Sequence, residues 1–345
     1  MKQISDYVVG VDLGATNIVS LLISRDGKVI ARDTRETMGG KGKKITFSQI
    51  VNSARNVIGE GERSGISSKS ILGMGIGGPG PLNSDGGVIH IAPNIPGWIN
   101  TYIAKELEDE LKLNVFLEND ANAAALGEWW LGAGRDVDNL VLLTLGTGVG
   151  GGIIIGGEVL HGARNTAGEI GHTIIHEGGL LCGCGNRGCL EAYVSARSVV
   201  KRTLAAIKEG KKTILTDLVK NKLEDITCKL VYDEARKGDS LCKLIVEETG
   251  RYLGIGIANI VNIINPEMVI LGGGMANAGD LIFEPVRKYA RGHSFTAAME
   301  GVKVVPAALG VNAGAIGAVA YVLKKKGLLK TIDNFDTDSL NPFRA

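Results

Sequence analysis

Short apolar runs broken by tight turns are the strongest pattern in this chain. Two stretches share one layout: YVVGVDLGATNIVSLLISRDGKVI begins at Tyr7, and NLVLLTLGTGVGGGIIIGGEVL begins at Asn139. Each has an apolar strand, a turn rich in glycine and threonine, a second apolar strand and another tight turn. Because the two hairpins lie about 130 residues apart, we predict two related domains of ordinary size.

Longer segments predict helices between and after these hairpins. Helices are expected over 47–59, 198–208 and 240–264, and another follows Trp98 in INTYIAKELEDELKL. The helix over 240–264 should stop at the Asn265-Pro266 pair. Further strands are expected in ILGMGIGGPGPL, NVFLEND and MVILGGG, and a closely packed helix of small residues in AGAIGAVAYVLKKKG. Strands that alternate with helices indicate the α/β class.

Size and charge narrow the possible functions. A chain of 345 residues is longer than one hydrophobic core usually serves, and 44% hydrophobic residues are ample for two cores. The 38 basic and 37 acidic side chains leave a net charge of +1, which argues against general binding to nucleic acid or to an anionic membrane. The uncharged stretch 140–157 is rich in glycine turns, so strand–turn–strand explains it better than a membrane span. We see no signal peptide before the first hairpin, and we expect a cytoplasmic protein.

Three glycine-rich turns are candidates for holding phosphate. Two matches to GxGxxG, at Gly75 and Gly146, are not followed by a helix and therefore do not predict a dinucleotide site. Consecutive backbone N–H groups in a turn can still bind an anion. Each turn alone would more often be a tight turn without a ligand, but three together favour a nucleotide. The candidate residues are Asp12 for Mg²⁺, with Gly14, Thr16 and Asn17 in DLGATN, Thr147 and Gly148 in GTGVGG, and Gly273 and Gly274 in LGGGM.

A run of polar residues follows the strand in LENDANAAALG. It places Glu118, Asn119 and Asp120 where the strand ends and a helix begins. Asp120 is a plausible N-cap, which is a purely structural role. A helix N-terminus also favours the ionised carboxylate, which can accept a hydroxyl proton during phosphoryl transfer. Both roles remain open at this point.

Three cysteines crowd into the segment HTIIHEGGLLCGCGNRGCLE. Cys182, Cys184 and Cys189, with a histidine at 172 or 176, form a set of ligands that suits tetrahedral Zn²⁺. A closed set of four ligands leaves no position for a reactive water, so we predict a structural ion. Cys228 and Cys242 lie far from this segment in helical surroundings, and we interpret them as ordinary core thiols.

Two glutamates flank the cysteine segment. Glu169 in GEIGH and Glu191 in CLE are suited to accept hydrogen bonds from the hydroxyl groups of a sugar. Either glutamate alone would more often be a surface residue. Their place on both sides of a metal loop favours the binding role.

These residues together resemble the ROK family (repressor, open reading frame, kinase) of sugar kinases and sugar-responsive repressors. The resemblance runs from GVDLGATN through GIGGPGPL, LENDANAAALGE and LTLGTGVGGGII to GEIGH, CGCGNRGCLE and VILGGG. It implies a two-domain actin-like or hexokinase-like ATPase fold, built from ribonuclease H-like repeats, with ATP and sugar meeting in an inter-domain cleft. Within the family the segment CGCGNRGCLEAYVSA is most similar to glucokinases, which implies phosphorylation of the 6-hydroxyl of glucose in glycolysis.

The resemblance also assigns roles to residues. Asp120 would be the catalytic base, and zinc would be held by His172, Cys182, Cys184 and Cys189. Sugar contacts would come from Asn94, Asn119, Asp120, Glu169, His172 and Glu191. The smaller domain would comprise 1–122 plus 313–330, including a C-terminal helix, and the larger domain 123–312, while 331–345 is a tail with no assigned role. Family members are commonly dimers or tetramers, so a homo-oligomer is expected.

Several alternatives accompany this hypothesis. Similar loops occur in kinases for N-acetylated hexosamines, mannose or fructose, and polyphosphate is an alternative to ATP as donor. A sugar-sensing repressor would carry a helix-turn-helix domain before the first phosphate turn, which here begins only about ten residues into the chain. A sugar-binding module without catalysis is disfavoured by the presence of Asp12 and Asp120.

Overall fold

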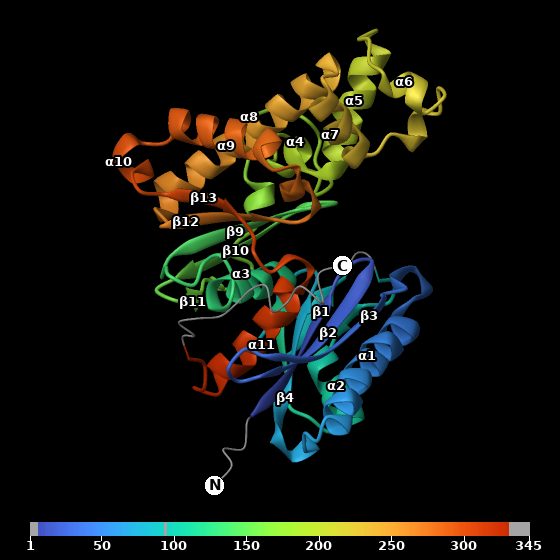
Figure 1. The fold of residues 1–345 in the computed structure, drawn as a ribbon, viewed down its shortest axis with the longest axis vertical. Helices are drawn as coiled ribbons and strands as arrows, with labels where there is room; N and C mark the ends of the chain where they lie inside the picture. Colours follow the sequence, from blue (N-terminus) through green and yellow to red (C-terminus); the bar gives the residue numbers. More distant parts are fainter. Residues whose placement is uncertain (1–5, 93–94, 331–345) are drawn as a thin grey trace. The chain divides into compact units, whose positions relative to one another are not determined.

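The computed structural model describes residues 6–92 and 95–330 of the chain (Figure 1). These residues form two compact units. The first unit lies within Met1–Leu140, Gly152–Gly168 and Ala308–Ala345, and the second within Val141–Gly151 and Glu169–Ala307. Residues 123–140 and 152–168, which the sequence led us to place in the larger domain, therefore lie in the first unit. The helix that contains residues 123–130 explains much of this difference, because it packs against the helix over residues 313–325.

A five-stranded sheet forms the centre of the first unit. Its strands run in the order β3-β2-β1-β4-β8. The first three strands form an antiparallel meander, and β4 and β8 continue the sheet in parallel with β1. The bounds are β1 (Tyr7–Leu13), β2 (Asn17–Ser24), β3 (Val29–Glu36), β4 (Ile71–Gly78) and β8 (Val115–Asn119). The strands predicted around 71–78 and 115–119 are thus confirmed.

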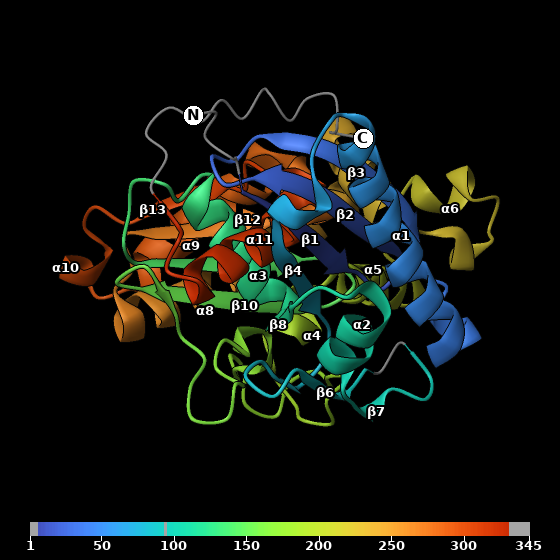
Figure 2. The ribbon, with the colours of Figure 1, turned by 90° about the horizontal axis from the view of Figure 1, so that it is seen from below.

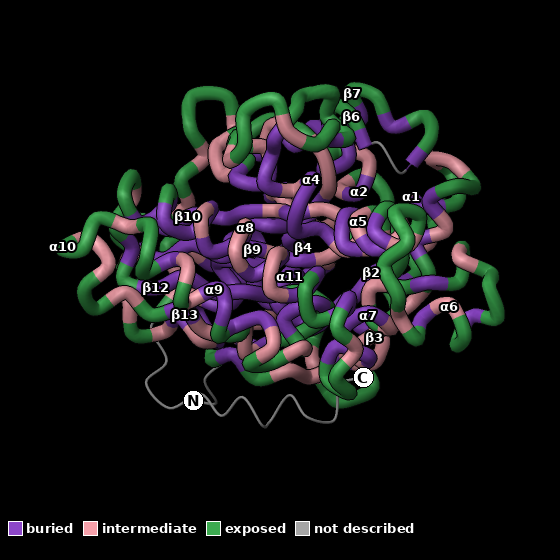
Figure 3. The backbone as a smooth tube through the Cα atoms, turned by 90° about the horizontal axis from the view of Figure 1, so that it is seen from above, coloured by how far each residue is buried: buried purple, intermediate pink, exposed green. Residues whose placement is uncertain are grey.

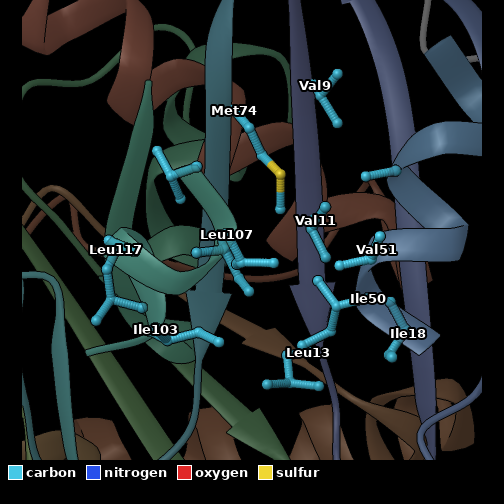
Figure 4. Packing of buried hydrophobic residues seen from close by; sticks show 14 of the residues in the cluster. Val9, Val11, Leu13, Ile18, Ile50, Val51, Met74, Ile103, Leu107 and Leu117 are labelled. Atoms are coloured by element: carbon cyan, nitrogen blue, oxygen red, sulfur yellow. The ribbon is translucent and has the colours of Figure 1, made fainter. Parts of the chain in front are cut away.

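Helices cover both faces of this sheet (Figure 2). The apolar side chains of β1 alternate, and Val9, Val11 and Leu13 enter a core that includes Ile50 and Val51 (Figure 4). These last two belong to α1, which contains the predicted helix 47–59. The four helices are α1 (Lys43–Arg63) and α2 (Ile103–Leu111), whose residues enter this core, and α3 (Asp120–Trp130) and α11 (Ala313–Lys325), which contact β4 and β8.

The opposite face of β1 and β4 is lined by glycine. A Cβ atom added at Gly10 or Gly75 would fall inside the van der Waals radius of a carbonyl oxygen of α11. Only glycine therefore allows the helix to lie this close to the strands. Asp12 is on this same face of β1, where its carboxyl lies against Gly314 of α11.

A small three-stranded sheet interrupts one predicted helix. It consists of β5 (Leu82–Asn83), β6 (Val88–Ile91) and β7 (Ile99–Thr101). The expected helix after Trp98 begins only at Ile103, because Ile99–Thr101 pairs with β6 and Asn100 has a positive φ of 46°. Short 3-10 turns in the first unit are η1 (Gly39–Lys41), η2 (Ser68–Ser70) and η6 (Gly310–Asn312).

The second sheet repeats the strand order of the first. Its order is β11-β10-β9-β12-β13, so a meander of three strands is again followed by two strands that come later in the chain. The two predicted hairpins, β1–β2 and β9–β10, occupy equivalent positions in the two sheets. The bounds are β9 (Leu140–Leu145), β10 (Val149–Ile155), β11 (Glu158–Val159), β12 (Met268–Gly272) and β13 (Lys303–Pro306).

Helices of the second unit pack mainly on one another. The long helix α8 (Ser240–Ile264) has the predicted bounds and ends at Asn265, whose left-handed backbone returns its N–H to the Val261 carbonyl. The remaining helices are α4 (Glu191–Val194), α5 (Ala196–Lys208), α6 (Leu215–Leu218), α7 (Cys228–Lys237), α9 (Asp280–His293) and α10 (Thr296–Met299), with 3-10 turns η3 (Ile170–His172), η4 (Leu223–Asp225) and η5 (Gly274–Ala278).

Buried backbone is concentrated in the central strands, whereas no residue of α10 is buried (Figure 3). Among the described residues, no helix combines the length and the apolar character needed to cross a bilayer.

Candidate active site

The strand–helix junction 118–120 places three polar side chains at the carboxyl end of β8. The N-cap of α3 is Asn119, not Asp120, because the Asn119 Oδ1 accepts hydrogen bonds from the N–H groups of Ala121 (3.0 Å) and Asn122 (3.2 Å). Asp120 is the first residue of the helix. The N-cap role considered for Asp120 therefore belongs to its neighbour. The Asp120 carboxylate lies at the positive end of the helix dipole, where its Oδ1 also accepts from the Ala121 N–H (2.8 Å).

A second carboxylate approaches this junction from β1. Burial and, to a lesser extent, the negative charge of Asp120 together raise the pKa of Asp12 to about 7. Two carboxylates that repel each other in this way gain from a divalent cation, which would favour the ionised form of both. The residues therefore fit a magnesium ion at Asp12.

The turn after Asp12 is closed by two hydrogen bonds. The Gly14 N–H donates to the Asn17 carbonyl (3.0 Å), and the Thr37 hydroxyl donates to the Gly14 carbonyl (2.7 Å). These bonds close a tight turn in which Thr16 and Asn17 are exposed. The hydroxyl and amide groups of the predicted phosphate residues are thus available at the surface of the first unit.

The second unit brings two glycine turns together. Gly146–Gly148 links β9 to β10, and Gly273 follows the neighbouring strand β12 with a φ of +84°. A Cβ at Gly273 would collide with the Leu145 carbonyl, so glycine is required there.

A cavity of about 500 Å³ opens beside these two turns. Thr147 and Gly274 line it, while Gly148 lies against Glu191. The rest of its wall is mainly apolar and comes from the start of α5, from α7 and from η5, through Leu145, Gly146, Ala196, Cys228, Lys229, Tyr232, Asp233, Arg236, Met275, Asn277 and Ala278. The volume and the apolar wall suit a flat heterocyclic ring.

Cys228 therefore differs from its expected role. We interpreted it as a core thiol, but it lines this cavity and is only half-buried, whereas Cys242 is buried as expected. The sequence could not predict this cavity. The residues of α7 that line it have the helical spacing that any amphipathic helix shows.

The cysteine segment folds into one compact cluster. The ligand atoms of His172, Cys182, Cys184 and Cys189 lie within 4.8 Å of one another. The Sγ atoms of Cys184 and Cys189 are 3.7 Å apart, and Cys182 Sγ is 3.7 Å from His172 Nδ1. Ligands about 2.3 Å from a tetrahedral ion would be separated by about 3.8 Å, so this geometry fits Zn²⁺.

The contacts of the two histidines favour His172 as the partner of the three cysteines. His176 Nδ1 lies 3.2 Å from the hydroxyl of Tyr193, and its ring stacks on that tyrosine. His172 alone joins the three cysteines in the cluster. Sequence spacing could not make this distinction because both histidines precede the cysteines by a few residues.

The cluster also contacts the two glutamates expected to bind sugar. Cys182 Sγ donates to Glu191 Oε1 (3.6 Å), and Glu191 Oε2 accepts from the Val149 N–H (2.9 Å). Glu169 is exposed, with its Oε2 4.0 Å from His172 Nε2. The cysteine cluster and the backbone N–H of Val149 therefore both contact one carboxylate, which lies at the start of α4.

Asn94 lies outside the described residues. Sequence reasoning missed the contact between His161 and the buried Glu118, because 43 residues separate them and no spacing motif joins them.

The matches to known proteins agree with this arrangement. The family model described as "ROK family" matches residues 8–325.

The chain belongs to the ROK family.

Relatives in this ROK family include both enzymes and regulators. A glucokinase from Halalkalibacterium halodurans is 37% identical over 312 residues, which are 90% of this chain and 93% of that protein. A xylose repressor from Caldicellulosiruptor bescii is 33% identical over 320 residues, 92% of this chain and 78% of that protein. A solved ROK family glucokinase from Streptomyces griseus, in complex with glucose and AMPPNP, has a TM-score of 0.76 and 33% identity, covering 90% of this chain and 97% of that chain. The ROK chain accordingly has the actin-like ATPase fold that the resemblance implied.

Proposed function

We propose that this ROK protein is an ATP-dependent hexose kinase that transfers the terminal phosphoryl group to the 6-hydroxyl of glucose. The observation that carries the proposal is the carboxylate pair in the first unit, where Asp120 begins α3 and Asp12 has its pKa raised to about 7. A pair of this kind serves phosphoryl transfer, which needs one carboxylate for the hydroxyl and another for a metal ion. Similarity to glucokinases over most of the chain supports the choice of sugar.

Asp120 would accept the proton of the attacking hydroxyl. It lies in the first turn of α3, where the helix dipole favours negative charge. Asn119 would contact the sugar as well, and its own orientation is fixed by the two N–H groups that it caps. A Mg²⁺ ion at Asp12 would offset the negative charge of the phosphates.

The nucleotide would be held by backbone turns. The exposed Thr16–Asn17 turn and the Thr147–Gly148 turn offer N–H and hydroxyl groups to phosphate oxygens. The cavity beside Gly274 would take the base, with Tyr232 and Met275 as its apolar walls. This cavity favours ATP over polyphosphate as the donor, since polyphosphate has no ring to fill it.

The cysteine cluster would have a structural role. A zinc ion there supplies four strong bonds that fix the loop 172–189, and it leaves no open position for chemistry. Glu191 lies beside this loop and is held by the Val149 N–H, and it would accept hydrogen bonds from sugar hydroxyls together with Glu169 and His172.

Initial rates of ADP formation would test this function. The purified protein is assayed with ATP and magnesium on glucose, mannose, fructose, N-acetylglucosamine and N-acetylmannosamine. We expect the highest kcat/KM on glucose. Faster turnover of another hexose would correct the sugar, whereas sugar binding without any ADP formation would indicate a sensor or repressor and contradict the kinase.

A further inference from the structure

Glu118 is a buried carboxylate directly before the catalytic junction. Its side chain is 1% exposed. One oxygen, Oε1, accepts hydrogen bonds from the Asn119 N–H (2.8 Å) and from the Asn122 amide (3.1 Å). These two donors stand on either side of Asp120 in the chain. The Glu118 carboxylate therefore holds the backbone from which Asp120 projects.

The other oxygen of Glu118 is held by a histidine from a distant loop. His161 follows β11, and its Nε2 donates to Glu118 Oε2 at 2.7 Å. This hydrogen bond raises the pKa of His161, although burial of the ring acts in the opposite direction. A buried carboxylate without a cation is costly, so the protonated histidine neutralises a charge that the junction needs.

The other charged groups around His161 balance one another. Asp85 and Lys325 form an ion pair of 2.9 Å, and the ring of Tyr321 lies 6.4 Å from the His161 ring. Asp85 raises the pKa of the histidine, and Lys325 lowers it. Among the described residues these are the groups that bear on its charge, with Glu118 as the dominant partner.

We propose that His161 is a positioning residue for phosphoryl transfer: by holding Glu118, it fixes Asn119 and Asn122 and so aims the Asp120 carboxylate at the sugar hydroxyl. The inference rests on the proposed kinase function and goes beyond it, because His161 belongs to none of the sugar, nucleotide or metal sets. Misplacement of a reacting group by about 1 Å can cost about a hundredfold in rate. His161 should therefore affect kcat much more than sugar affinity.

Two substitutions separate positioning from a merely structural role. His161→Phe removes the donor, and His161→Gln keeps an N–H that can reach Glu118. The control is His293→Phe, which changes an exposed histidine of α9 whose ring contacts the carbonyl and the ring of Tyr289. We expect His161→Phe to lower kcat about tenfold to a hundredfold with KM for glucose within about threefold, His161→Gln to recover part of the loss, and His293→Phe to match the wild type.

The pH dependence of kcat gives a readout that folding alone would not change. His161 acts in its protonated form, so its contribution is complete at low pH and is lost as pH rises through its raised pKa. The wild type should show this loss on the alkaline side, and His161→Gln, which cannot titrate, should lack it. Melting temperature and glucose binding by calorimetry are measured on each variant, so that only folded protein is compared.

The outcomes distinguish this inference from the proposed function. Wild-type protein that phosphorylates no sugar overturns the kinase assignment and the inference with it. An active wild type whose kcat is unchanged in His161→Phe overturns the inference alone. Equal losses of kcat and glucose binding in both His161 variants, with the alkaline limb retained, would also overturn it.

Discussion

At the scale of single residues, the junction 118–120 shows which parts of a site a sequence reveals. Polar residues directly after an apolar strand indicated Asp120, because ligands bind at the carboxyl ends of strands in such sheets. The spacing of three cysteines indicated a metal cluster. The capping role of Asn119 was missed, since both neighbours are good caps and only the backbone geometry decides between them. The His161–Glu118 contact was missed because it depends on how β11 folds back toward β8.

The role of Asp120 predicts a selective loss of turnover. Asp120→Asn keeps the size and polarity of the side chain but removes its ability to accept a proton. We expect kcat to fall at least about a hundredfold, while the dissociation constant for glucose changes by less than about fivefold. Steady-state rates and isothermal calorimetry measure the two quantities.

A matched control for this variant is Asp217→Asn in α6, remote in sequence from every proposed site residue. It should leave both quantities unchanged. Turnover of Asp120→Asn near the wild-type rate would rule out the assigned base.

At the scale of elements, the hydrophobic pattern predicted most helices and strands. It did not predict which of them pack against one another. The sequence predicted the small-residue helix that became α11. The reason for its small residues is visible only in the structure. Gly317 packs against Ala123 and Gly127 of α3, and a side chain at this position would have no space. The late start of α2 has a similar origin, because β6 draws residues 99–101 into a strand before the helix can begin.

The tight α3–α11 contact predicts a strong effect of a single methyl group. In Gly317→Ala the new Cβ would overlap the Ala123 carbonyl and the Gly127 backbone, so one helix must shift. We expect the free energy of unfolding to fall by about 2 kcal/mol or more, measured by urea denaturation. Since α3 carries Asp120, kcat should fall as well.

The comparison variant is Gly292→Ala in α9, where a Cβ meets no atom within 4 Å. Alanine is the better helix former, so this protein should be as stable as the wild type or slightly more stable. Equal stability of the two variants would contradict the packing argument.

At the scale of the whole molecule, the sequence predicted a repeat, and the two sheets share one strand order. The boundaries between the two units were harder to predict. The chain passes from one unit to the other four times, at 140–141, 151–152, 168–169 and 307–308. A hydrophobic pattern reports which residues are buried, not against which element. Residues 152–168 follow a glycine turn of the second unit and yet belong with the first.

The metal cluster predicts a change in the stability of the whole protein. Cys184→Ser replaces a strong zinc ligand with a weak one, in a loop with little regular secondary structure of its own. We expect bound zinc, measured by mass spectrometry of the purified protein, to fall well below one ion per chain. The melting temperature should fall by several degrees, because metal binding contributes directly to folding.

Glucose affinity should weaken in the same variant, because the loop that zinc would hold lies against Glu191. Cys228→Ser is the control, since this thiol lies outside the cluster and should leave the zinc content unchanged. Full zinc occupancy in Cys184→Ser would refute the ligand assignment.

The position of α11 in the chain has a consequence for synthesis. The ribosome makes residues 313–325 after nearly all of the first unit and all of the second, yet this helix fills the glycine-lined face of β1 and β4. A nascent chain can complete the fold of residues 169–307 while the earlier sheet still waits for its covering helix. Until that helix emerges, this face of the sheet remains open to chaperones, and neither Asp12 nor α3 has the helix against which it packs.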